Sequence, residues 1–206
     1  MKRAILIIML LLPLYSIAQD RNLQILQKAI DGGDPASITI LNLSKNNLTS
    51  LPPEIGQLKN LKVLNLRRNE LTSLPSEIGQ LKNLTYLGLS YNDLTSLPSE
   101  IGQLQNLTGL GLLDNDLTSL PPEIGKLQNL TWLDLGGNKL KTLPPEIVQL
   151  QKLTELDLRD NDFTSLPSEI VQLQNLIVLW LYDNDIPEAE RQKIESWLPN
   201  CYIYWK

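Results

Sequence analysis

The sequence contains no histidine and a single cysteine among its 206 residues. Without histidine, neither a Ser-His-Asp or Cys-His catalytic arrangement nor a histidine-ligated zinc site can be assembled. One cysteine cannot close an internal disulfide, which excludes a disulfide scaffold. Basic residues are outnumbered 18 to 23 by acidic ones, the formal net charge is −5 and the pI is near 4.8. The chain therefore lacks the basic surface typical of proteins that bind nucleic acid or anionic membranes.

Residues 1–18 have the pattern of a secretory signal peptide. Lys2 and Arg3 precede an almost wholly apolar run over 4–14, and small residues stand at 16 and 18. A run of about a dozen apolar residues is well short of the ~20 that span a bilayer, so we do not expect membrane insertion. We predict cleavage near Ala18, which takes the formal charge from −5 to −7. The mature protein is expected to be secreted and extracellular, or periplasmic.

A 23-residue pattern then repeats without a slip. Its form is LxxLxLxxNxLxxLPxEIxxLxx, the signature of a leucine-rich repeat. Units begin at Ile38, Leu61, Leu84, Leu107, Leu130, Leu153 and Leu176. Residues 38–186 thus hold six complete repeats and one partial repeat. The pattern predicts an α/β fold, a right-handed leucine-rich-repeat solenoid in which each LxL segment is a short strand of one concave parallel sheet.

Two further letters of the repeat indicate how each coil turns. An asparagine at the ninth position recurs in every unit, where its amide can satisfy backbone groups left unpaired as the chain leaves the strand, and we predict a buried asparagine ladder. The Leu-Pro-x-Glu-Ile segment predicts a short helical turn that begins at proline, with a column of solvated glutamates near its positive end. Gly56, Gly79, Gly102 and Gly125 are expected to keep that turn brief.

The ends of the stack must differ from the repeat, because a solenoid otherwise exposes its core there. Residues 19–37 are predicted to form an N-terminal cap with a helix over 20–31. Residues 187–206 are predicted to form a C-terminal cap with a helix up to Trp197 and a last strand over 201–205. Cys201 is interpreted as a small buried apolar residue of this cap.

Positions that vary between repeats are the places where a binding specificity can lie. They are the third, fifth and seventh positions, whose side chains point away from the core on one side of the sheet; we call this surface the concave face. Gly88, Gly109 and Gly111 lie between the strands of Tyr86 and Trp132. We expect the two rings to flank a shallow trough with a floor of backbone, suited to an anchoring side chain or a sugar ring.

Aromatic and charged side chains on and beside this face make up the predicted partner-binding set. The set is Tyr86, Tyr91, Leu113, Trp132, Trp180, Tyr182, Arg67, Arg159, Asp134 and Asp157. The arginines, with Arg68, and the aspartates would tune orientation and association rate. The alternative is that the aromatic residues only have strand propensity and bury one another across neighbouring coils.

Acidic side chains allow two further interpretations, neither of which we adopt. Aspartates follow the strands of repeats four to seven and could hold calcium, although turns at strand exits also select aspartate. Asp134 with Asp157 or Glu155 could form the carboxylate pair of a glycosidase, but such pairs are more often solvated or directed at a partner. We assign no catalytic residue, no metal and no cofactor.

The repeat unit from Ile38 to Ile186 resembles the 23-residue class of Ras-suppressor and Scribble-type proteins and, more closely, secreted spirochaete leucine-rich-repeat proteins. The segment from Glu190 through Trp197 to Cys201 also resembles the ending of that group. The resemblance implies extracellular recognition of proteins, including host surface or matrix molecules, and transfers no fixed binding residues. We therefore predict a non-enzymatic module that binds a protein partner, with carbohydrate or peptidoglycan binding as the alternative.

Overall fold

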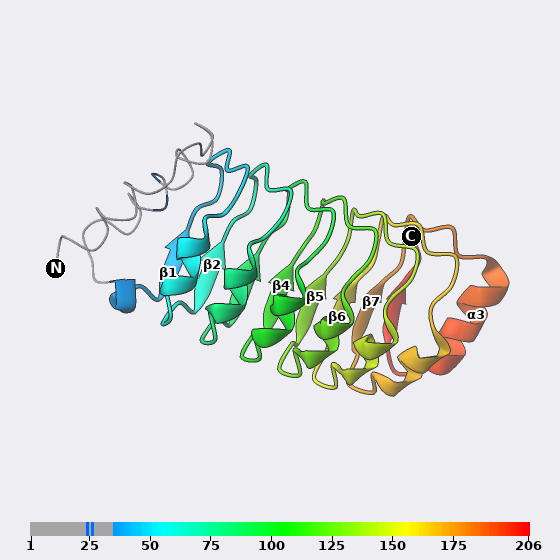
Figure 1. Ribbon diagram of the computed structural model, residues 1–206. Helices are drawn as coiled ribbons and strands as arrows, with labels where there is room; N and C mark the ends of the chain where they lie inside the picture. Colours follow the sequence, from blue (N-terminus) through cyan, green and yellow to red (C-terminus); the bar gives the residue numbers. More distant parts are fainter. Residues whose placement is uncertain (1–23, 25, 27–34) are drawn as a thin grey trace, which may run out of the picture.

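The computed structural model describes residues 24, 26 and 35–206, and these residues form a solenoid of stacked coils (Figure 1). Its strands are β1 (Ile40–Asn42), β2 (Val63–Asn65), β3 (Tyr86–Gly88), β4 (Gly109–Gly111), β5 (Trp132–Asp134), β6 (Glu155–Asp157), β7 (Val178–Trp180) and β8 (Tyr202–Tyr204). The 3-10 helices are η1 (Pro35–Ser37), η2 (Pro53–Gln57), η3 (Ser76–Gln80), η4 (Ser99–Gln103), η5 (Pro122–Lys126), η6 (Pro145–Gln149) and η7 (Ser168–Gln172). One α-helix, α3 (Glu188–Trp197), follows β7.

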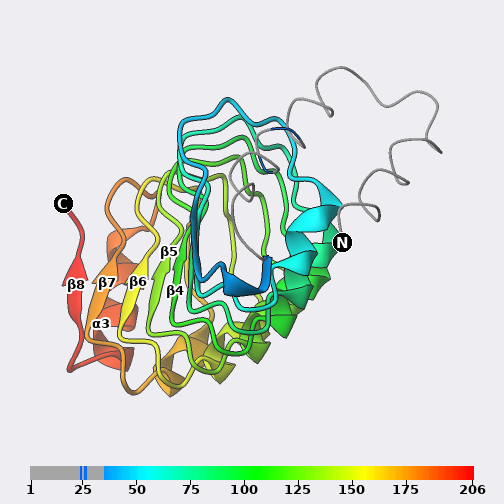
Figure 2. The same cartoon turned by 90° about the vertical axis from the view of Figure 1, so that its left-hand side faces the viewer.

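The strands form one eight-stranded sheet in the order β1 to β8, with every pairing parallel. Strands β1 to β7 pair at a spacing of one repeat, so that Leu64 lies beside Leu87. Strand β8 joins the same sheet with Tyr204 beside Trp180. Figure 2 shows the sheet on one side of the coils and the 3-10 helices on the other. The predicted solenoid and its parallel sheet are confirmed.

Repeat leucines and isoleucines fill the space between sheet and 3-10 helices. Leu87 and Leu89, predicted to face inward, are both 0% exposed, and so is Phe163, which replaces a leucine in the sixth repeat. Burying such a side chain contributes about 1.5–3 kcal/mol. A single coil has too little apolar area to be stable alone, so the core stabilises the fold only when coils stack on one another.

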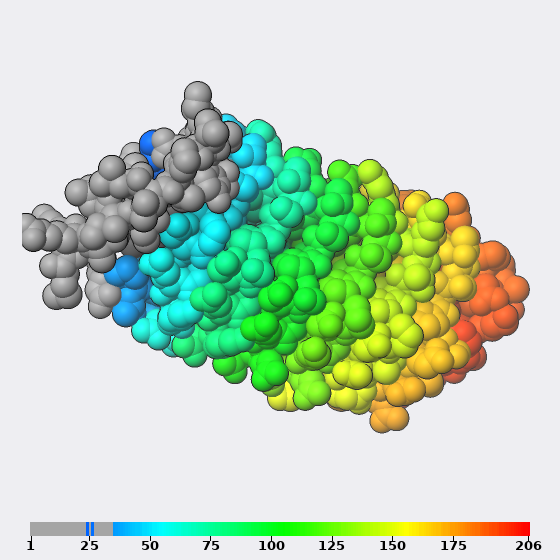
Figure 3. Space-filling model, in the orientation of Figure 1, coloured from blue at the N-terminus to red at the C-terminus, as the bar shows by residue number. Residues whose placement is uncertain are grey.

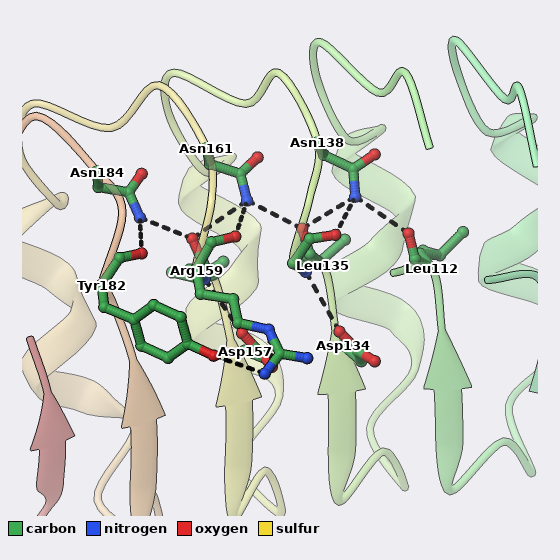
Figure 4. Close-up of polar contacts among 11 residues, drawn as sticks. Leu112, Asp134, Leu135, Asn138, Asp157, Arg159, Asn161, Tyr182 and Asn184 are labelled. Atoms are coloured by element: carbon green, nitrogen blue, oxygen red, sulfur yellow. Dashed lines mark hydrogen bonds and ion pairs between the residues drawn. The ribbon is translucent and has the colours of Figure 1, made fainter. Parts of the chain in front are cut away.

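The predicted asparagine ladder is present. Asn115 shows its chemistry: its Oδ1 accepts the Leu94 N–H at 3.1 Å, and its Nδ2 donates to the carbonyls of Leu89 and Leu112. From Asn69 onward, each asparagine of the ladder thus ties its own coil to the preceding one, as Figure 4 shows for Asn138, Asn161 and Asn184. The inner five are 7–8% exposed, and Asn46 and Asn184 at the two ends are half-buried.

Glycine in the 3-10 turns has a different role from the one we predicted. Helices η6 and η7 carry valine at this position and are five residues long, the same length as η3, so glycine does not set the length of the turn. A β-carbon on Gly102 would instead lie 2.6 Å from the Glu123 carbonyl oxygen of the next coil. Glycine is therefore required for the close stacking of these turns, which form successive ridges on the side shown in Figure 3.

The C-terminal segment contains a helix that ends at Trp197 and a last strand, as the sequence predicts. Helix α3 begins after Pro187 and buries Ile194, and the indole N–H of Trp205 donates to the Glu195 carboxylate at 2.9 Å. Cys201 is half-buried between α3 and β8, and burial raises the pKa of its thiol to about 11. The predicted signal peptide lies outside the described residues. Of the predicted N-terminal helix only Gln24 and Leu26 are described; both are helical, and Leu26 is 1% exposed.

Candidate binding surface

The concave face extends one strand further than the repeat pattern indicates. Strand β8 lies 24 residues after β7 rather than 23, and its Tyr202 and Tyr204 continue the third- and fifth-position columns. Tyr202 is 71% exposed and Tyr204 is 47% exposed. Sequence reasoning assigned both to the cap because the extra residue breaks the repeat register. The alternation Tyr-Ile-Tyr is the signal that could have placed them on this face.

Tyr86 and Trp132 do not flank an open trough. Their rings are nearly parallel, at 11°, with centroids 6.2 Å apart. A flat group inserted between two rings needs about 7 Å, twice the usual carbon–carbon contact distance. The rings lie over the intervening glycines, which are buried: a β-carbon on Gly109 would meet Tyr86 at 3.1 Å and Trp132 at 3.4 Å. The prediction of a trough was wrong, and the rings form a raised platform.

A second aromatic pair lies at the other end of the face. The rings of Trp180 and Tyr204 are 6.0 Å apart at 13°. Both pairs show that outward-facing aromatic residues partly cover one another, as the alternative interpretation expected. All of the predicted aromatic residues nevertheless remain half-buried rather than fully buried, so their rings are accessible to a partner.

Between the aromatic pairs lies a polar network on β5, β6 and the turns that follow β6 and β7 (Figure 4). Asp134 and Asp157 are register partners on adjacent strands and are 8% and 7% exposed. Arg159 places its Nε 3.2 Å from Asp157 Oδ2 and donates through Nη1 to the Tyr182 hydroxyl at 2.7 Å. The structure thus brings together four predicted residues: Asp134, Asp157, Arg159 and Tyr182.

Burial dominates the electrostatics of the two aspartates. It raises the pKa of Asp157 to about 6, even though the Arg159 backbone N–H and guanidinium favour the ionised form. Burial also raises the pKa of Asp134, against the hydrogen bond from the Gly136 N–H and the charge of Arg159. The hydrogen bond with Tyr182 raises the pKa of Arg159, so the network holds a fixed positive charge.

A separate cluster lies on the coils of β2 and β3. The guanidinium carbons of Arg67 and Arg68 lie 5.7 and 5.2 Å from the centroid of the Tyr91 ring. Both arginines are exposed, and neither forms an ion pair with a described residue. Leu113 is half-buried and lies between this cluster and the polar network, with its Cδ1 next to Gly136.

The acidic side chains of this face are accounted for by contacts and turns within the described residues. Asp157 is engaged by Arg159, and two shallow grooves of the described surface are lined by residues other than these aspartates. No three acidic or cysteine side chains within 35–206 are placed to share a metal ion. Asp114, Asp160 and Asp183 have left-handed backbone angles, which aspartate tolerates better than most residues, so turn geometry accounts for them.

The sequence analysis missed two hydrogen-bond ladders at the amino ends of the strands. Thr85, Thr108, Thr131 and Thr154 each donate to the backbone carbonyl one repeat earlier, as Thr108 does to Thr85 at 3.0 Å. Asn83, Asn106 and Asn129 also bond the preceding coil and line a shallow groove of about 580 Å³. Their recurrence in the repeat was the available signal.

Three models of the same repeat family match the chain. They are described as leucine rich repeat over 36–94, leucine-rich repeat region over 77–140 and leucine rich repeats (2 copies) over 128–168. The chain is a leucine-rich-repeat protein. No curated protein sequence matches it. No helix among the described residues of this leucine-rich-repeat protein is long and apolar enough to cross a membrane.

Solved structures agree with this assignment. A leucine-rich-repeat protein of Leptospira interrogans is 44% identical, with a TM-score of 0.73 over 82% of this chain and 49% of that one, which supports a bacterial origin. The ectodomain of the Arabidopsis thaliana receptor kinase GASSHO1/SCHENGEN3, in complex with Casparian strip integrity factor 2, is 32% identical (TM-score 0.66, 73% of this chain, 19% of that one). A plant peptide hormone receptor in complex with its ligand is 30% identical (TM-score 0.65; 76% and 26%).

Proposed function

We propose that this leucine-rich-repeat protein is an exported, non-enzymatic module that recognises a protein partner on a host surface or in the extracellular matrix through its concave face. One observation carries the proposal: the aromatic platform of Tyr86 and Trp132, the polar network and the Trp180–Tyr204 pair lie on one side of a single sheet. Half-buried tryptophan, tyrosine and arginine side chains are the types that dominate protein–protein hot spots.

Two further findings support a protein partner. The receptor kinase ectodomain named above was solved in complex with Casparian strip integrity factor 2 and the plant peptide hormone receptor in complex with RGF2, and both are similar to most of this chain. The closed platform also favours a protein over a glycan, because the 6.2 Å spacing between Tyr86 and Trp132 does not admit a sugar ring between them. The carbohydrate alternative is left with stacking on the outer ring faces.

The experiment is affinity capture from host cell-surface and matrix extracts by the protein and by a Tyr86→Ser/Trp132→Ser variant. The matched control is Val171→Ser, which removes a 46% exposed apolar side chain from the 3-10 helix side. Circular dichroism checks that all three are folded. We expect the parent and the control to retain the same proteins and the double variant to lose them.

Retention by the double variant would place binding elsewhere on the molecule. Capture by none of the three would refute a host protein partner. Loss of captured material upon addition of free sugars would favour the carbohydrate alternative.

A further inference from the structure

Arg67 and Arg159 occupy the same seventh position of their repeats, four coils apart, and this pair provides an internal comparison. In both coils the side chain two residues earlier accepts the backbone N–H of the arginine at 3.1 Å, from Asn65 Oδ1 in one case and Asp157 Oδ1 in the other. The local turn is therefore the same in the two coils.

The partners of the two guanidinium groups differ. Arg159 has the second oxygen of Asp157 at 3.2 Å. Arg67 has in the same place the amide of Asn65, which carries no charge. No carboxylate of the described residues lies within 4 Å of Arg67 or of Arg68. The charge of Arg67 favours the ionised form of Asp134, and so acts against the effect of burial on the pKa of that carboxyl. The two side chains are not in direct contact.

The backbone supplies a second, independent observation. The eighth position of each repeat has a left-handed conformation, at φ 57° for Arg68 and φ 61° for Tyr91. Glycine, asparagine and aspartate suit this conformation, and later repeats carry Asp114, Gly137 and Asp160 there. Lys45, Arg68 and Tyr91 occupy it in the first three coils, although each side chain adds strain. Strain of this kind points to a functional use of the side chains.

Both guanidinium groups lie against the Tyr91 ring. Their carbons lie 5.7 and 5.2 Å from its centroid, within the range of cation–π contact. Two cations are thus both held against the Tyr91 ring, and the exposed Lys45 lies in the adjacent coil. Guanidinium groups that are already ordered lose less entropy when they bind a planar, two-oxygen anion.

We propose that Arg67, Arg68 and Tyr91, the arginine–tyrosine cluster, bind a carboxylate of the partner, that is, an acidic side chain of the bound protein. The partner's carboxylate takes the place that Asp157 fills beside Arg159. The inference rests on the proposed function, because Arg67 belongs to the concave face, but its test does not require the natural partner.

The test measures binding of a fluorescently labelled hexaglutamate peptide to the full chain by fluorescence anisotropy at low ionic strength, where charge interactions are least screened. Hexaglutamine with the same label controls for the backbone and the dye. The informative variant is Asn65→Asp, which supplies an internal carboxylate to Arg67 and keeps the oxygen that accepts its N–H. Arg67→Gln/Arg68→Gln removes the cluster directly.

Asn42→Asp is the matched control. Asn42 occupies the same column one coil earlier, and its Oδ1 accepts the Ser44 N–H in the same way, but a serine stands where Arg67 would be. We expect Asn65→Asp and the double arginine variant each to weaken hexaglutamate binding about fivefold or more, and Asn42→Asp less than about twofold. Urea unfolding of each variant checks that the fold is retained.

The proposal is overturned if Asn65→Asp binds hexaglutamate like the parent, if Asn42→Asp weakens binding equally, or if the parent does not distinguish hexaglutamate from hexaglutamine. The two hypotheses fail separately. If none of the three proteins in the capture experiment retains a partner but hexaglutamate behaves as expected, the proposed function is refuted and the arginine–tyrosine cluster is supported. If partners are captured as expected but Asn65→Asp binds hexaglutamate like the parent, the proposed function is supported and the arginine–tyrosine cluster is refuted.

Discussion

Replacing the buried Asp157 by asparagine should stabilise the protein at pH 8. The pKa of this carboxyl is raised from 3.8 to about 6, chiefly by burial, so the folded protein holds its proton more tightly than the unfolded chain does. Between about pH 4 and 6 the folded state carries more protons, and the free energy of unfolding therefore falls as pH rises through this window. Above about pH 6 the full penalty of the buried charge applies.

The size of the effect follows from the difference between the folded and unfolded pKa values. A difference of one in pKa corresponds to about 1.4 kcal/mol, so the rise from 3.8 to about 6 is worth about 3 kcal/mol. An asparagine in place of Asp157 would carry no charge at any pH and could still accept the Arg159 N–H through Oδ1, as Asn65 does for Arg67. We expect Asp157→Asn to raise the free energy of unfolding by up to about 3 kcal/mol at pH 8 and to change it little at pH 4.

Urea unfolding followed by circular dichroism at pH 4, 6 and 8 measures this difference, with the exposed Asp160→Asn as the control for loss of a surface charge. A variant that is less stable than the parent at pH 8 would refute the reasoning. It would mean that the ion pair with Arg159 at 3.2 Å outweighs the cost of burying the carboxylate.

Three other predictions test the fold. Asn115→Ala should lower the free energy of unfolding by about 1–3 kcal/mol, because a buried N–H and two carbonyls lose their partner, whereas the half-buried Asn184→Ala should cost less in the same urea titration. Gly102→Ala should cost about 1–3 kcal/mol, since its β-carbon would meet a backbone oxygen at 2.6 Å, and Gly56→Ala, which meets mainly the movable Gln80 side chain, should cost less; equal costs would contradict the steric account. Cys201 should react with iodoacetamide at pH 8 about a hundredfold more slowly than an unperturbed thiol, and unfolding in urea should remove the difference.

Much of the candidate surface could be inferred without coordinates. A residue at the third, fifth or seventh position of a repeat must lie on the concave face, because side chains alternate along a strand and every coil has the same register. Tyr86, Trp132 and Asp157 were placed there on that ground alone. Tyr202 and Tyr204 were missed because the last coil contains α3 and one additional residue.

The repeat pattern alone was enough to predict the solenoid, its parallel sheet, the leucine core and the asparagine ladder. A period of 23 residues places the same core, turn and hydrogen-bonding residues at the same positions of every coil. How side chains of different coils meet could be seen only in the folded protein. The lean of Tyr86 toward Trp132, the engagement of Arg159 by Asp157 and the lack of a described carboxylate beside Arg67 depend on rotamers and on contacts between neighbouring strands. The repeat sets the position of each Cα, but the packing of variable neighbours decides where each side chain ends.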